Sequence, residues 1–159
     1  MRKITVLTFG MFMVFADVLA SDKVQLNGVT FVPADSNLIK TVIVDENKTI
    51  TKYPSPAKVM EFNIMQVNGR SPVNENHYIY NSLVHFMIYV TKESGIFYVD
   101  DKKHHVKVGD VIVVPPKTRF AVLGDDLGYI AVENPAWFPQ QHFIVDKNNQ
   151  RADHSSIVK

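Results

Sequence analysis

From Val24 onward the chain consists of short β-forming runs separated by turn-forming residues, and no long stretch has a helical period. The dipeptides Asn27-Gly28, Asn68-Gly69, Gly109-Asp110 and Gly124-Asp125 tolerate positive φ and therefore mark expected reversals. The predicted strands are 24–32, 38–44, 49–52, 58–67, 79–91, 96–99, 104–108, 111–114, 119–123 and 129–132. Because many short antiparallel strands must hide their edges, we expect an all-β sandwich, jelly roll or closed barrel.

The N-terminal residues are typical of a secretory signal peptide. Arg2 and Lys3 give a positive start, the run 4–16 is almost wholly apolar, and Ala20 fits the end of a small-residue cleavage site. Cleavage after Ala20 predicts a periplasmic or secreted protein without stable membrane insertion. The charge of Asp17 is unusual so near the cleavage site. The alternative is an uncleaved membrane anchor, for which the apolar run is short.

Composition narrows the function classes. At 159 residues the chain has room for one domain, and we expect a signal peptide at 1–20, a barrel domain at 21–145 and a polar, loose tail at 146–159. Lys and Arg (17) nearly balance Asp and Glu (16) and form no basic stripe, so a nucleic-acid partner is not expected. The absence of cysteine excludes disulfides, thiolate metal sites and cysteine nucleophiles.

The stretch 88–137 resembles the cupin family at both of its signature motifs. Ile88-Tyr89-Val90 followed by the hairpin 95–100 resembles the second half of the first motif. The run 109–116, Gly-Asp-Val-Ile-Val-Val-Pro-Pro, is similar to the second motif, a glycine followed after five residues by proline, and Asn134-Pro135-Ala136-Trp137 resembles the segment that often follows the barrel. The resemblance implies an antiparallel cupin-type β-barrel, or jelly roll. It also implies a homodimer formed by strand exchange, in which residues 24–44 would add to a partner's sheet.

In metal-binding cupins the first motif provides two histidines and a glutamate, and the second motif provides another histidine. The resemblance places the histidine pair at Tyr80 and Ser82, the glutamate at Phe86 and the last histidine at Phe120. Phenylalanine has no donor atom, and a neutral serine or tyrosine is a poor ligand for a divalent ion. No metal cofactor is therefore expected.

The alternative is a rebuilt site for Fe, Mn, Ni or Zn that uses His77 or His85. Both have odd numbers, whereas the inferred inward positions are even, so a β-bulge would be needed to turn them inward. The other histidines are expected at the surface or in loops: His104, His105, His142 and His154.

Side chains alternate between the two faces of a strand, so the even positions from 78 to 88 are expected to face the barrel interior. The predicted ligand-binding residues are Tyr78, Tyr80, Ser82, Phe86, Phe120 and Val122, with Val84 and Ile88 completing the lining. An aromatic wall with a few hydroxyls suits a small organic molecule. The alternative is that these side chains only fill the core of a small barrel.

Three functional hypotheses follow. The first is a metal-free, cupin-like protein that binds a small organic molecule. The second is an enzyme, either metal-dependent with relocated histidines or metal-independent and isomerase-like; Glu133 is a possible acid or base, but the sequence places no partner beside it. The third is a structural or assembly role. Trp137-Phe138 is expected to cap the barrel or to pack on another subunit.

Overall fold

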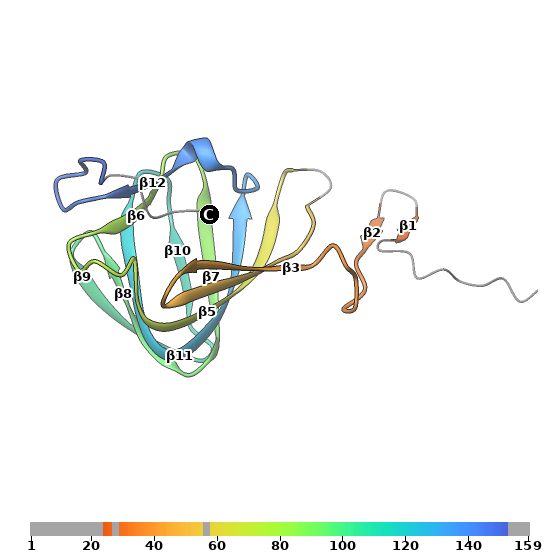
Figure 1. The fold of residues 1–159 in the computed structure, drawn as a ribbon, viewed down its shortest axis with the longest axis horizontal. Helices are drawn as coiled ribbons and strands as arrows, with labels where there is room; N and C mark the ends of the chain where they lie inside the picture. The colour runs from red at the N-terminus through yellow and green to blue at the C-terminus, as the bar shows by residue number, and fades with distance from the viewer. Residues whose placement is uncertain (1–23, 27–28, 56–57, 153–159) are drawn as a thin grey trace, which may run out of the picture.

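The computed structural model describes residues 24–26, 29–55 and 58–152 (Figure 1). The predicted signal peptide, the Asn27-Gly28 turn and His154 lie outside the described residues. The elements are β1 (Val24–Leu26), β2 (Val29–Phe31), β3 (Lys40–Asp45), β4 (Lys48–Lys52), β5 (Glu61–Ser71), β6 (Tyr78–Asn81), β7 (His85–Lys92), β8 (Ser94–Val99), β9 (Lys102–Lys107), β10 (Val111–Val114), β11 (Arg119–Asn134), the 3₁₀ turn η1 (Pro139–Gln141) and β12 (His142–Val145). The all-β prediction is confirmed. Within the described residues, no helix has the length and apolar character needed to cross a membrane.

The long strand β11 organises the barrel, because each of its edges pairs with two other strands. On one edge its first half pairs with β8 and its second half with β7; on the other edge it pairs with β6 and then with β5. The sheet continues from β5 to β4 and β3, and β12 adds to β6. All of these pairs are antiparallel, and the sheet curls around a single apolar core (Figure 1).

Two of the turns predicted from the sequence, at Asn68-Gly69 and Gly124-Asp125, do not reverse the chain and are irregularities within strands. Gly69 lies inside β5 with a φ of +121°, and it faces Gly124 of β11 across the sheet. The pairing of β11 with β5 shifts register between Gly124 and Leu127, so the two runs predicted at 119–123 and 129–132 are one bulged strand. Residues that tolerate positive φ serve a bulge as well as a turn, and the local sequence does not distinguish the two. Gly109-Asp110, by contrast, is the expected turn before β10.

The strand predicted at 79–91 is two strands, β6 and β7. The break between them changes which positions, odd or even, face the barrel interior. In β7 the even positions are buried, as expected, but in β6 the buried residues are the odd ones, Ile79 and Asn81. A bend at Ser82 and Leu83 separates the two strands. The prediction that even positions face inward is therefore confirmed for Val84, Phe86 and Ile88 and is wrong for β6.

Both ends of the described chain extend beyond the barrel wall. The β1–β2 hairpin forms a separate two-stranded sheet that lies apart from the barrel (Figure 1). After β12, Asp146 accepts hydrogen bonds from the backbone N–H groups of Asn148 and Gln150, and Arg151 pairs with Val145. The first part of the tail, predicted to be loose, thus forms a closed turn against β12.

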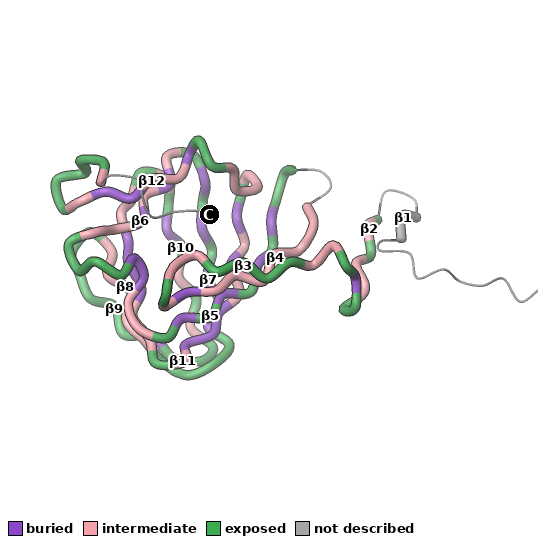
Figure 2. The backbone as a smooth tube through the Cα atoms, in the orientation of Figure 1, coloured by how far each residue is buried: buried purple, intermediate pink, exposed green. Residues whose placement is uncertain are grey.

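The outer face of the β10-β7-β11-β5 sheet carries two cross-strand rows of apolar side chains. One row is Val113, Met87, Val132 and Phe62, and the other is Val111, Tyr89, Ile130 and Ile64. Most of these residues are exposed. Figure 2 colours the backbone by burial and shows buried and exposed residues along the strands of the barrel. Antiparallel sheets usually present polar residues on the face turned to water, so these two rows, called the outer apolar face below, depart from that pattern.

Candidate ligand-binding site

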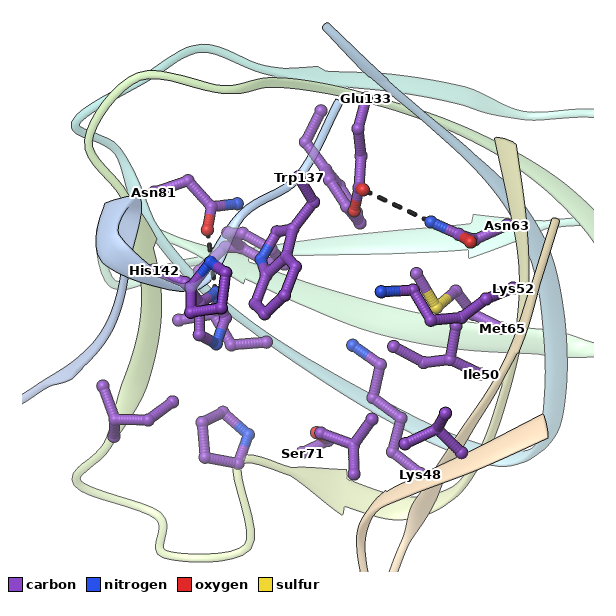
Figure 3. A pocket seen from close by; sticks show the side chains of 18 of the residues that line it. Lys48, Ile50, Lys52, Asn63, Met65, Ser71, Asn81, Glu133, Trp137 and His142 are labelled. Carbon is purple, nitrogen blue, oxygen red and sulfur yellow. Dashed lines mark hydrogen bonds between the residues drawn. The ribbon is translucent and has the colours of Figure 1, made fainter. Parts of the chain in front are cut away.

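The barrel encloses a cavity of about 280 Å³ between the β3–β4 hairpin and the segment from Trp137 to β12 (Figure 3). Most of its wall is apolar, with Ile50, Met65, Ile79, Phe86, Phe120 and Ile144 at its surface. Several side chains with polar atoms also line it: Lys48, Lys52, Asn63, Ser71, Asn81, Glu133, Trp137 and His142. A concave site with apolar walls and a few polar groups has the character of a small-molecule pocket.

Strand β5 places polar residues inside the barrel, because its inward-facing positions begin with two polar side chains before the apolar ones. Glu61 and Asn63 have the same parity as Met65 and Val67, and all four are buried. A period of two extended back from the apolar residues would therefore have identified Glu61 and Asn63 from the sequence. They were missed because their polarity alone suggests an exposed position.

Glu133 lies at the end of β11, buried beside Asn63. The Asn63 Nδ2 atom donates a hydrogen bond to Glu133 Oε2 at 3.3 Å. Burial, followed by the like charge of Glu61, raises the pKa of Glu133 to about 8, although Lys48 and Lys52 oppose the shift. The Glu133 carboxyl is therefore largely protonated at neutral pH, and it can donate a proton or a hydrogen bond.

An ion pair and an aromatic ring lie together at one side of the cavity, and the residues are Lys52, Glu61 and Trp137. Lys52 Nζ lies 3.4 Å from Glu61 Oε1, and the backbone N–H of Trp137 donates to Glu61 Oε2 at 3.0 Å. The Lys52 ammonium also lies 4.7 Å from the centre of the Trp137 ring. Trp137 thus caps the barrel from within the chain, as one of the sequence alternatives predicted.

His142 and Asn81 form a second polar wall, which adjoins the Trp137 ring. His142 Nδ1 lies 2.9 Å from Asn81 Oδ1, and the His142 ring packs edge-on against Trp137 with a centroid distance of 5.5 Å. The Asn81 Oδ1 atom also accepts from Gln141 Nε2 at 3.4 Å. The expectation that His142 is a surface residue is wrong, because β12 pairs with β6 and brings the ring back to the cavity.

No family model matches the sequence, and no curated protein matches it. Solved structures do match. Pac13 of Streptomyces, described as a nucleoside dehydratase, superposes with a TM-score of 0.61 at 19% identity, over 69% of this chain and 86% of that chain. A cupin-2 domain protein of Rhodospirillum rubrum has a TM-score of 0.54 at 13% identity, over 74% and 78%. A cupin 2 conserved barrel protein of Rhodopseudomonas palustris has a TM-score of 0.52 at 18% identity, over 64% and 69%. The chain has the cupin fold. These identities relate the proteins through the fold alone.

The residues at the usual cupin metal position do not fit a metal ion. Phe86 and Phe120 face each other inside the barrel with ring centroids 5.4 Å apart, and neither has a donor atom. Because β6 is reversed, Asn81 faces the cavity in place of Tyr80 and Ser82, and its Oδ1 is already engaged. Within the described residues, no group of three or more His, Asp or Glu side chains is placed to hold a metal.

The two histidines proposed for a rebuilt metal site are not brought together in the cavity. His85 begins β7 on its exposed face, and His77 lies in the loop before β6. Neither lines the cavity. The outward direction predicted for His85 from its parity is confirmed.

Of the six predicted ligand-binding residues, the structure places Phe86 and Phe120 in the cavity wall and the other four elsewhere. The Tyr78 hydroxyl donates to Asp101 Oδ1 at 3.0 Å, and the Tyr80 ring packs against Phe143. The Ser82 hydroxyl donates to the backbone oxygen of Gln141 at 3.2 Å. Val122 is a fully buried core residue. Tyr78 and Tyr80 miss the cavity because of the reversal at the bend after β6.

Proposed function

We propose that this protein is exported and binds a small organic molecule in the barrel cavity. The cavity supports the proposal, since its volume of about 280 Å³ is near the lower end of the range of about 300–1,000 Å³ for ligand pockets. A neighbour of the same fold, Pac13, is described in complex with uridine, which is also a small organic molecule. The sequence of residues 1–20 supports export. A mature protein recovered from the periplasm or medium should begin at Ser21 by mass; an intact N-terminus would contradict cleavage.

Filling the cavity should weaken binding. Ile50→Phe adds volume at the cavity wall and takes up space that a ligand would use, so the affinity for benzamide or benzyl alcohol should fall about tenfold. Trp137 is the only tryptophan and lines the cavity, so its fluorescence reports binding directly. The matched control is Ile64→Phe on the outer face, which should bind as the wild type does. Equal affinities for the Ile50→Phe and Ile64→Phe variants would argue against this cavity as the binding site.

A metal-independent acid–base enzyme is the second candidate. The observation that favours it is the presence, in one cavity, of the Glu133 carboxyl, whose pKa burial raises, and of the Lys48 amine, whose pKa burial lowers. Such a pair suits an isomerisation or elimination of a small carbonyl compound. Deuterium exchange at the α-carbon of small ketones in D₂O tests this candidate. Exchange should be lost in Glu133→Gln, and exchange that is the same in both proteins would argue against the role.

We also propose a homodimer formed through the outer apolar face. Met87→Lys places a charge in the middle of this face and should shift the protein to the monomer, because a desolvated unpaired charge opposes association. Light scattering on a gel-filtration column gives the mass of each variant. Val108→Lys, at another exposed apolar position, is the control and should remain a dimer. A wild-type protein that is monomeric at micromolar concentration would rule out this interface.

A further inference from the structure

Lys48 is an unusual lysine because its side chain is only 5% exposed. It begins β4, and Figure 3 shows its chain extending into the middle of the cavity with the nitrogen at the tip. The ammonium forms no hydrogen bond or ion pair with any described residue. An ammonium that faces a mostly apolar cavity without an ion-pair partner favours a compensating anion there.

The acids near Lys48 do not supply that group. Asp45 acts electrostatically on Lys48 but makes no ion pair with it, and its Oδ2 accepts from the Ser71 hydroxyl at 2.6 Å and its Oδ1 from the Asn47 backbone N–H at 2.9 Å. Glu133 is the other acid that acts on Lys48, and its carboxyl is largely protonated at neutral pH. Within the described residues, the cavity therefore has one cation that no carboxylate contacts directly.

The remaining charges in the cavity balance each other. Lys52 is paired with Glu61, and Asn81 and His142 engage each other on the other side of the Trp137 ring. Asn63 presents a buried Oδ1 atom that has no hydrogen-bond partner within the described residues. Around Lys48 the wall is apolar, with Ile50 and Met65 beside it in Figure 3.

We propose that the ligand of this cavity is a small organic monoanion, a carboxylate on an apolar body, and that Lys48 pairs with its carboxylate. The inference rests on the proposed binding function and adds its ligand class. One ammonium without a direct ion-pair partner matches one negative charge, and a charge-assisted hydrogen bond in a mostly apolar cavity is strong. The neutral Glu133 carboxyl can donate to a second oxygen of the ligand, and the apolar wall accommodates its hydrocarbon body.

The test compares acids with their neutral amides. Benzoate and benzamide, furoate and furamide, and cyclohexanecarboxylate and its amide have nearly the same shape within each pair, and only the acid is ionised at pH 7. In the wild type, at least one acid should bind about tenfold more tightly than its amide, by Trp137 fluorescence and by calorimetry. This comparison needs no variant.

A variant then assigns the preference to one side chain. Lys48→Met keeps the length and apolar stem of the residue, and it should weaken binding of the acid about tenfold while leaving the amide within about twofold. Lys40→Met, on the exposed edge of β3, is the matched control and should keep the wild-type preference. Thermal unfolding of each variant shows that it is folded.

The outcomes separate the two proposals. Amides that bind as tightly as their acids, or an acid preference that survives Lys48→Met, would overturn the assignment of a monoanion to Lys48 while leaving the cavity as a binding site. Failure of every acid and every amide to bind the wild type would overturn both the ligand class and the proposed binding function.

Discussion

The Glu133→Gln variant should be more stable than the wild type at pH 9 and close to it at pH 5. An unfolded glutamate ionises near its ordinary pKa of 4.5, whereas burial and the charge of Glu61 raise the pKa of folded Glu133 to about 8. Between these values the folded protein holds a proton that the unfolded chain has lost. Rising pH therefore lowers the free energy of unfolding of the wild type by about 1.4 kcal/mol per unit for this one group.

Glutamine cannot ionise, so the free energy of unfolding of the variant does not fall with pH for this reason. At pH 9 the free energies of unfolding of the two proteins should differ by a few kcal/mol. Urea denaturation at pH 5, 7 and 9 measures it. Glu46→Gln, at an exposed position in the β3–β4 turn, is the control and should follow the wild-type curve. Parallel pH profiles for the wild type and Glu133→Gln would show that Glu133 is ionised in the folded protein at neutral pH.

Phe120→Ala should be the most destabilising simple truncation in the cavity wall. Phe120 is 1% exposed and its ring packs on Phe86, so removing the ring loses both its burial and the contacts around it, at a cost of about 3–5 kcal/mol. The free energy of unfolding in urea measures the loss. The same substitution at Phe31, which is 61% exposed in β2, is the control and should cost little. Equal losses would mean that the Phe86–Phe120 pair is not part of the barrel core.

Glycine and proline residues in the sequence predicted the bounds of some strands correctly and those of others incorrectly. β10 was predicted with its observed bounds, because a glycine turn precedes it and Pro115 cannot continue the ladder. Gly69 and Gly124 carry the same local signal as Gly109, yet they form a kink and a bulge in paired strands. Whether such a residue reverses the chain depends on the strand that pairs with it, and that strand is distant in sequence.

The sequence by itself determined the all-β class, the cupin resemblance and the inward direction of Phe86 and Phe120, because period-two alternation holds within one unbroken strand. The tertiary structure decided the register of β6, which a two-residue bend reversed, and hence the exclusion of Tyr78 and Tyr80 from the cavity.

The tertiary structure also decided which polar residues line the cavity, and these come from distant parts of the chain: Lys48, Lys52, Asn63, Asn81, Glu133, Trp137 and His142. Their proximity depends on the pairing of β4 with β5, β5 with β11 and β6 with β12. Strand pairing between distant segments is set by the packing of the whole core and by register, which local sequence patterns do not specify. For that reason Glu133 had no visible partner in the sequence, whereas in the folded barrel it lies beside Asn63 and shares a cavity with Lys48.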